Sequence, residues 1–489
     1  MPFVLGIDSS TQSTKVEVRD LESGDLVAAG RGPHAPTVPP ISEQHPDTWW
    51  QALRIACRKA IDAGGFAPAD VVAISVAAQQ HGLVALDADG RPVHPAKLWN
   101  DTESAPDADR LVAEQGAEQW ASATGSVPVA AFTVTKVAWL ARSHPEALRR
   151  VAHLLLPHDW LTYQLTGRFV TDRGDASGTG YWCPTDGQWR PELLALATGT
   201  ESDRWVSTLP TVLGPSEAAG TLTASGADFL GLGGRNTVVA AGTGDNMAAA
   251  LGLGMRTGDV AISLGTSGTA YAVATTATAD SSGAVAGFAD ATGGFLPLVC
   301  TLNATLATEA VARWLGVDIE MLDRLASEEA QPGAAGVTFL PYLAGERTPN
   351  RPNATGAIAG LRVDTSAASI ARAGFEGVVC GLLDGVDALA AAGVPVSEPD
   401  GRRFLLGGGS RSRTYRQVTA DLLQRTITVP GDDEHVARGA CVQAAMALRT
   451  VASEQVLEAW PVPEPHSVRP DAAIDAAAIR HRYAQVRGH

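Results

Sequence analysis

The stretch IDSSTQSTK, Ile7–Lys15, joins two short apolar runs through a turn of hydroxyl side chains. A second stretch, DVAISLGTSGTAYAV at 259–273, repeats its pattern. The aligned pairs are Ile7 with Ile262, Thr11 with Thr266, Thr14 with Thr269, and Val18 with Val273. Both copies predict a strand, a small-residue turn and a second strand. An internal duplication of this kind is a fold-level signal and predicts two related α/β halves, each opening with a hairpin.

Further strand and helix patterns follow each hairpin. In the first half, Pro46–Ala63 predicts a helix that Gly64 ends, and the apolar run at 71–78 predicts a strand covered on both faces. In the second half, we expect a long helix at 367–392 and a strand running into a glycine turn at 403–410. The predicted division is a first domain at 1–240, a second at 241–460, and a linker with a terminal helix at 461–489.

Length and composition limit the class of protein. The 489 residues are too many for one ordinary core and favour two large domains. The apolar share of 45% and charged share of 18% are typical of a soluble globular protein. A net charge of −16 argues against nucleic acid or an anionic membrane as a partner. Five scattered cysteines and the lack of a leader or a membrane-length apolar run predict a cytoplasmic protein.

The two hydroxyl-rich turns are candidate phosphate sites. Small side chains let backbone N–H groups face a phosphate, and hydroxyls add donors. Either turn alone is more typical of an ordinary hairpin, whereas the pair favours a polyphosphate clamped across a cleft. Asp8 ends the first strand, where it could meet a phosphate-bound Mg²⁺ through water. Lys15 is either a phosphate contact or a solvated strand residue, and the sequence leaves both open.

Two glycine-rich turns lie further along the chain. In AGTGDN, 241–246, Asp245 follows a buried strand and is either a general base or a helix N-cap. In LLGGGSRS, 405–412, three glycines would let a flat ligand approach the backbone, although a plain strand-to-helix turn has the same pattern.

Polar and aromatic residues in AAQQHG, 77–82, and LWND, 98–101, suit a polyhydroxylated ligand. Gln80, His81, Trp99 and Asp101 are the candidates there. A lone histidine is more often structural, and a lone tryptophan more often belongs to the core. The sequence contains no metal-ligand spacing and no G-x-x-x-x-G-K-[ST] loop, and a dinucleotide site is weakly supported.

Taken together, these motifs are similar to those of the FGGY carbohydrate kinases. The resemblance extends over nearly the whole chain, and the motifs are highly specific in this order. They are GIDSSTQSTKV (6–16), SEQHPDTWW (42–50), QQHG (79–82), LWND (98–101), FTVTKVAWL (132–140), LLPHDWLTYQLTG (155–167), GTGDN (242–246), ISLGTSGT (262–269), FLPYLAGERTP (339–349) and LLGGGSRS (405–412).

The resemblance implies a fold and a reaction. The fold would be two ribonuclease-H-like domains of the actin, hexokinase and Hsp70 superfamily, with a deep cleft between them. The reaction would be ATP-dependent and Mg²⁺-dependent phosphorylation of D-xylulose to D-xylulose 5-phosphate. Ribulose, gluconate or glycerol are alternative acceptors, and an ATPase of the actin or Hsp70 type is a further alternative. The partners would be a small sugar and ATP, with a homodimer left open.

The resemblance also assigns roles to residues. Asp245 would be the general base and Asp8 the metal-binding carboxylate. The sugar would be bound by Gln80, His81, Trp99, Asp101, Asp245 and Asn246. ATP would be bound by Thr11, Lys15, Gly265, Thr266, Gly408, Gly409 and Ser412. Three positions depart from the usual pattern of the family: Gln80 replaces a methionine, Thr243 a glycine, and Ser9-Ser10 a Leu-Gly or Phe-Gly pair.

Overall fold

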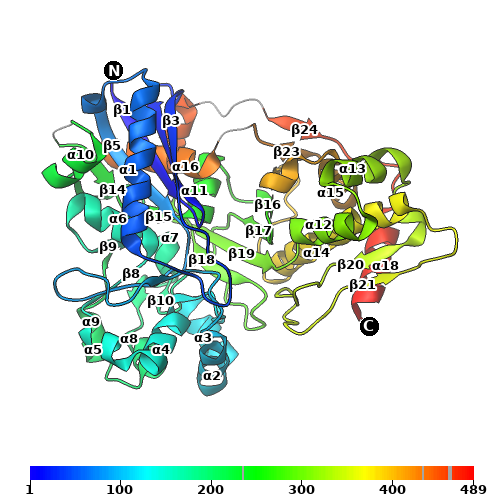
Figure 1. The fold of residues 1–489 in the computed structure, drawn as a ribbon, viewed down its shortest axis with the longest axis horizontal. Coiled ribbons are helices and arrows are strands. Elements are labelled where there is room, and N and C mark those ends of the chain that lie inside the picture. Colours follow the sequence, from blue (N-terminus) through cyan, green and yellow to red (C-terminus); the bar gives the residue numbers. More distant parts are fainter. Residues whose placement is uncertain (234–235, 432–433, 461–464, 489) are drawn as a thin grey trace.

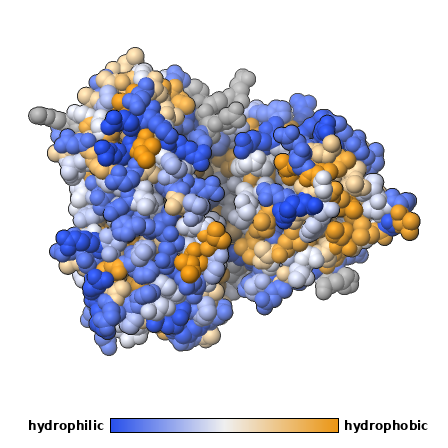
Figure 2. All heavy atoms as spheres, in the orientation of Figure 1, coloured by the Kyte–Doolittle hydropathy of each residue, from blue (hydrophilic) through white to orange (hydrophobic). Residues whose placement is uncertain are grey.

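Both hairpins predicted from the repeat are present, one in each of two lobes. The computed structural model describes residues 1–233, 236–431, 434–460 and 465–488 (Figure 1). The blue-to-green first half of the chain forms one lobe, and most of the green-to-red second half forms the other. A groove separates the two masses in the space-filling view (Figure 2). None of the described helices is long and apolar enough to cross a bilayer.

The first lobe is built on a mixed sheet with the order β13-β14-β5-β1-β2-β3, and β15 pairs with β5 beside that path. Strands β1, β2 and β3 form an antiparallel meander, and β5 joins β1 in parallel. Its strands are β1 (Phe3–Ser9), β2 (Ser13–Asp20), β3 (Leu26–Pro33), β5 (Val71–Ala78), β13 (Ala218–Thr221), β14 (Val238–Ala240) and β15 (Thr243–Gly244).

The second lobe repeats this topology. Its order is β18-β19-β17-β16-β22-β23-β24, so β16 and β17 correspond to β1 and β2, and β22 corresponds to β5. Its strands are β16 (Val260–Leu264), β17 (Gly268–Ala272), β18 (Ala286–Ala289), β19 (Phe295–Thr301), β22 (Arg403–Leu406), β23 (Ile427–Val429) and β24 (His466–Val468). The duplication predicted from the sequence is therefore confirmed at the level of strand order.

One long helix covers the antiparallel part of each sheet. Helix α1 (Pro46–Ala63) packs on β2 and β3, and α14 (Ala367–Ala391) packs on β17 and β19. His45 caps α1 by accepting the N–H of Asp47, Pro46 fits its first turn, and Gly64 ends it at a φ of 78°. Helix α1 buries the apolar face that carries Trp49 and Leu53.

Helix α16 (His435–Arg449) comes from the end of the chain but packs on the first sheet. In Figure 1 this orange helix lies among the blue strands, beside α11 (Asp245–Gly252). Gln443 of α16 accepts a 2.6 Å hydrogen bond from Ser75 of β5. A Cβ at Gly6 of β1 would lie 2.1 Å from the Ala437 carbonyl oxygen, so this contact requires a glycine.

The remaining helices complete the two halves of the chain. In the first half they are α2 (Ala105–Gln115), α3 (Ala117–Thr124), α4 (Thr133–Ser143), α5 (Pro145–Arg150), α6 (Pro157–Thr166), α7 (Arg173–Ala176), α8 (Pro191–Thr198), α9 (Asp203–Val206) and α10 (Ala224–Leu230). In the second they are α12 (Thr305–Leu315), α13 (Ile319–Arg324), α15 (Arg413–Leu423), α17 (Ser453–Ala459) and α18 (Ala476–Gly488). Of the linker predicted to begin at residue 461, residues 461–464 lie outside the described residues, and β24 within it pairs with β23.

Candidate active site

The turn between β15 and α11 carries Asp245. Gly244 is the N-cap of α11, and Asp245 is its first helical residue. One carboxylate oxygen of Asp245 accepts hydrogen bonds from the backbone N–H and the side-chain amide of Asn246, at 2.8 and 2.9 Å. Burial, and next the negative charge of Asp175, raise the pKa of Asp245 to about 7. A carboxylate with that pKa is suited to accept a proton near neutral pH.

The end of β5 brings a second polar group to the same edge. Strand β15 pairs in parallel with β5, with Thr243 opposite Ala77 and Gly244 opposite Ala78. The residues that follow each strand therefore meet at one edge of the sheet. Gln80 accepts a 2.9 Å hydrogen bond from the Asn246 side-chain amide. The structure thus joins Gln80, Asn246 and Asp245 in one hydrogen-bond network. The resemblance assigns these three residues to one ligand but does not predict their contacts.

His81 adjoins this network in a constrained geometry. Its φ of 65° lies in the left-handed region, and its ring stacks on Phe132 with centroids 5.0 Å apart. Its Nδ1 lies 2.7 Å from the carbonyl oxygen of Gly178. Burial, and next the charge of Lys136, lower the pKa of His81 to about 3, so the ring is neutral. Nδ1 must then carry the proton, which leaves Nε2 as a hydrogen-bond acceptor for a ligand hydroxyl.

Trp99 and Gln79 both contact the first hydroxyl-rich turn. Its indole N–H donates to the hydroxyl of Thr11 at 2.9 Å, and that hydroxyl donates to Gln79 at 3.2 Å. Trp99 is partly exposed, whereas Gln79 is buried. Thr11 therefore lies against both segments, 77–82 and 98–101, that carry the candidate ligand-binding residues.

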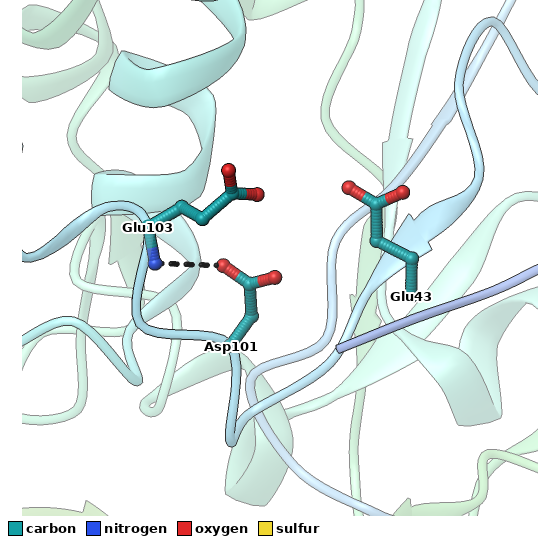
Figure 3. A group of neighbouring side chains, drawn as sticks. All are labelled: Glu43, Asp101 and Glu103. Atoms are coloured by element: carbon teal, nitrogen blue, oxygen red, sulfur yellow. Dashed lines mark hydrogen bonds between the residues drawn. The ribbon is translucent and has the colours of Figure 1, made fainter. Parts of the chain in front are cut away.

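Asp101 belongs to a buried ionic cluster around Lys97. The Lys97 ammonium lies 2.9 Å from Glu43, 2.8 Å from Asp101 and 2.7 Å from Glu103. Burial alone would lower the pKa of Lys97, but the hydrogen bonds to these carboxylates raise it above its ordinary value. Figure 3 shows the three acidic side chains, the one group with metal-ligand spacing among the described residues. Because Lys97 supplies the cation, this cluster needs no metal ion.

The carboxylate of Asp101 is fully engaged within this cluster. One oxygen accepts from Lys97 and from the backbone N–H of Ser42, and the other accepts from the N–H of Glu103. Asp101 has 0% exposed surface. The geometry therefore makes Asp101 a support for the loop that presents Trp99.

Asp8 and Lys15 face each other across the first hairpin, where their positions are paired. Their side chains are 3.7 Å apart, and Lys15 also contacts Glu434 at 2.6 Å. Burial raises the pKa of Asp8 to about 7 against the opposing effect of Lys15. Within the described part of the chain, Oδ1 of Asp8 is buried without a hydrogen-bond partner. An unpartnered carboxylate oxygen fits a role toward a hydrated Mg²⁺ ion.

A cavity of 1170 Å³ lies where the lobes meet. Gln12 of the first turn and Gly265 and Thr266 of the second line it together, so both hydroxyl-rich turns reach one cavity. The cavity is also lined by three other residues that were predicted to bind ATP, namely Gly408, Gly409 and Ser412. Thr11 and Lys15 are not among its lining residues, and the Ser412 hydroxyl hydrogen-bonds to Asp323 and caps α15.

Helices α12 and α13 supply much of the cavity wall, which the sequence does not predict. The additional lining residues are Leu264, Thr305, Thr308, Glu309, Asp318, Ile319, Glu320, Met321, Asp323, Arg324, Phe375, Arg411 and Tyr415. Most of them lie on faces of α12, α13, α14 and α15, where no local motif marks them as part of a cavity. The packing of these helices beside the second turn brings them together.

Comparison with known proteins places the whole chain in one class. Residues 3–252 match the FGGY family of carbohydrate kinases, N-terminal domain, and residues 260–448 match its C-terminal domain. The chain is 47% identical over 461 residues to a xylulose kinase of Streptomyces coelicolor, covering 94% of this chain and 91% of that protein. It is 46% identical over 460 residues to a xylulose kinase of Streptomyces rubiginosus, with the same coverage of 94% and 91%.

A solved structure shows the same architecture. The crystal structure of xylulose kinase from Bifidobacterium adolescentis superposes with a TM-score of 0.87 at 37% identity, covering 100% of this chain and 99% of that one. The two repeated sheets and the cleft between them are therefore those of this class of enzymes. The predicted fold class is confirmed.

Proposed function

The chain belongs to the FGGY family of carbohydrate kinases, and from that membership we propose that it transfers the γ-phosphate of ATP to D-xylulose, giving ADP and D-xylulose 5-phosphate. The observation that carries the choice of sugar is the 47% identity, over 94% of the chain, to a xylulose kinase. The polar network at the ends of β5 and β15 supports it, because it offers several hydrogen-bonding groups to a polyhydroxylated ligand.

Asp245 is the proposed general base. Its carboxylate accepts the proton of the terminal hydroxyl of the sugar while that oxygen attacks the γ-phosphorus of ATP. The bond between the γ-phosphorus and the β,γ-bridging oxygen breaks, and ADP leaves with the electron pair. Phosphoryl transfer depends mainly on positioning and on charge neutralisation, so one placed carboxylate suffices on the protein side.

The sugar is proposed to lie against the first lobe. Gln80 and Asn246 would bind hydroxyls, Nε2 of His81 would accept a further hydroxyl proton, and Trp99 would cover one face of the sugar. Asp101, whose oxygens are already engaged, would act by holding the loop of Trp99. This arrangement leaves Asp245 as the only carboxylate that we place at the reacting hydroxyl.

ATP is proposed to occupy the cavity between the lobes. The Gly265–Thr266 turn would hold phosphates, and the glycines of the 405–412 turn, with α13, would surround the adenosine. Lys15 would neutralise phosphate charge from the first turn, with Thr11 shaping that turn. The unpartnered oxygen of Asp8 suits Mg²⁺, held through its water shell. When bound, that ion would supply charge neutralisation at the phosphates.

A panel of acceptors in a coupled ADP-release assay tests this function. D-xylulose, D-ribulose, gluconate and glycerol are compared by kcat/KM at saturating ATP. We expect D-xylulose to exceed each of the others by at least about 10-fold, since a site built on hydrogen bonds to hydroxyls discriminates strongly against misplaced ones. Preference for another acceptor would change the assigned sugar, and ATP turnover that no acceptor stimulates would favour an ATPase of the actin or Hsp70 type.

A further inference from the structure

The segment Asp172–Gly178 is largely buried beside the turn that carries Asp245, and it contains none of the residues proposed to bind a substrate. It begins at the end of β9 (Val170–Asp172) and includes α7. The Asp172 carboxylate caps that helix by accepting the N–H of Gly174 at 2.8 Å and that of Asp175 at 2.9 Å. Asp172 is itself only 2% exposed, so the segment has a fixed internal structure.

The same carboxylate holds the turn that carries Asp245. Oδ2 of Asp172 accepts a 2.7 Å hydrogen bond from the hydroxyl of Thr243, two residues before the base. The Gly174 backbone lies close to residues that precede and follow Asp245 in the sequence. A Cβ built at Gly174 would lie 2.9 Å from the Thr243 hydroxyl and 3.0 Å from Cγ of Met247. The segment therefore contacts the residues that flank Asp245 in the sequence.

The other end of the segment holds the sugar-edge histidine. The carbonyl oxygen of Gly178 accepts the proton of His81 Nδ1 at 2.7 Å. A Cβ at Gly178 would lie 2.6 Å from the His81 ring, so the backbone there touches the ring directly. The segment Asp172–Gly178 thus contacts both the turn that carries Asp245 and the ring of His81.

A buried ionic group anchors this segment to α6. Nδ1 of His158 lies 2.8 Å from Asp175, and its Nε2 lies 3.0 Å from Asp159. All three side chains are at most 1% exposed. Gly242, at a φ of 83°, passes close to the same ring, since a Cβ there would lie 2.6 Å from Cδ2 of His158. The segment is therefore held by α6 as well as by its own hydrogen bonds.

We propose that Asp172–Gly178 sets the spacing between the base Asp245 and the sugar ligand His81, with Thr243, Asp172 and Gly178 as positioning residues. This inference rests on the proposed function, because it concerns the acceptor side of that reaction. None of the three is placed against the reacting atoms. Their effect is on geometry, and an error of about 1 Å in a reacting group costs on the order of 100-fold in rate.

Two variants of Thr243 test the base end. Thr243→Val keeps the shape of the side chain and removes the hydroxyl, whereas Thr243→Ser keeps the hydroxyl. We measure kcat, KM for D-xylulose, KM for ATP, sugar-independent ATP hydrolysis and the thermal midpoint. We expect Thr243→Val to lower kcat for sugar phosphorylation by about 10-fold or more. KM for ATP and sugar-independent hydrolysis should stay within about 2-fold of wild type, and Thr243→Ser should retain kcat within about 3-fold.

A third variant tests the sugar end and does not depend on Thr243. Gly178→Ala would push the His81 ring away, so KM for D-xylulose should rise by about 5-fold or more while KM for ATP does not change. If Thr243→Val fails to fold, the result for Gly178→Ala decides the proposal by itself. A folded Thr243→Val variant with wild-type kcat, a Thr243→Ser variant as slow as Thr243→Val, or an unchanged sugar KM in Gly178→Ala would overturn it. Wild-type protein that phosphorylates no sugar would instead overturn the proposed function.

Discussion

At the scale of single residues, the chemistry depends on how each side chain is held. Asp245 keeps one oxygen bonded to Asn246, which in turn donates to Gln80. The resemblance assigned all three residues to one site, because the turns that carry them have local signatures. The hydroxyl contact between Thr243 and Asp172 could not be predicted, since it joins positions 71 residues apart that share no motif. Asp101 shows the same limit, because only the structure reveals its bonds to Lys97.

Replacing the base should stop turnover and spare nucleotide binding. Asp245→Asn keeps the size of the side chain but cannot accept the proton, and a general base contributes about 100- to 10,000-fold. We expect kcat to fall by at least about 100-fold, with the ATP dissociation constant within about 3-fold of wild type. The coupled assay and calorimetric titration measure these quantities. A variant with a tenth or more of the wild-type kcat would show that another group acts as base.

The rate should depend on pH through the same carboxylate. Burial and Asp175 raise the pKa of Asp245 to about 7, and only the ionised form accepts a proton. Activity is therefore lost as pH falls through about 7 and reaches a plateau above it. The profile of kcat between pH 5 and 9 measures this, at saturating sugar and ATP. A flat profile down to about pH 5 would place the pKa of the base near that of an ordinary aspartate.

At the scale of secondary-structure elements, the cavity proposed for ATP depends on close contact between β16 and β22. Gly407 follows β22 at a φ of 79°, and a Cβ there would lie 2.6 Å from the Leu264 carbonyl oxygen at the end of β16. The run of glycines at 407–409 predicted a ligand close to the backbone or a plain strand-to-helix turn, but not this contact with β16. The helices α12 and α13 beside it were not recognised as part of the site, because a lining residue on a helix face has the same pattern as a solvated one.

A methyl group at Gly407 should separate these strands. Gly407→Ala adds backbone strain of about 1–3 kcal/mol, because a φ of 79° with a ψ of 177° is a conformation essentially restricted to glycine, and it also adds a clash with Leu264. We expect KM for ATP to rise several-fold and the thermal midpoint to fall. Gly393→Ala is the matched control, because Gly393 has a φ of 81° with nothing within 4 Å of the added carbon. Equal effects of the two substitutions on KM for ATP would show that contact with Leu264 is unimportant.

The loop from β7 (Ala96–Lys97) to α2 should depend on the Lys97 ammonium. Lys97→Met leaves three carboxylates facing one another without a cation, and breaking a buried ion pair costs about 3–5 kcal/mol. We expect a clear loss in thermal midpoint at pH 7.5, because the three carboxylates then repel one another. Arg91→Met, which removes an exposed pair with Asp89, should cost under about 1 kcal/mol. Equal losses in the two variants would contradict this account of the cluster.

At the scale of the whole molecule, the two lobes contribute different parts of one site. The first lobe carries Asp245, Asp8 and the residues proposed to bind the sugar, and the second supplies most of the lining of the cavity proposed for ATP. The internal repeat in the sequence was enough to predict two related lobes, because each copy contains a complete hairpin. It could not predict that α16 crosses back to the first sheet, since an apolar helix face does not identify the sheet it covers.

Binding of substrates should bring the lobes together. The two phosphate turns belong to different lobes, and closure would exclude water that competes with the sugar as acceptor. We expect the radius of gyration from small-angle scattering to decrease when D-xylulose and a non-hydrolysable ATP analogue are both present. The sugar alone should produce part of that change. A radius of gyration that is the same in all states would count against closure.

The return of α16 to the first sheet has a consequence for biosynthesis. The ribosome delivers β1 and β5 long before the helix that covers them, which is made only after most of the second lobe. Until then, the face that later meets Ala437 and Gln443 stays bare, so the nascent first lobe remains unfinished while the second lobe is being made. Separately produced halves of this enzyme would each lack an essential neighbour, and the kinase should arise only when the halves assemble together.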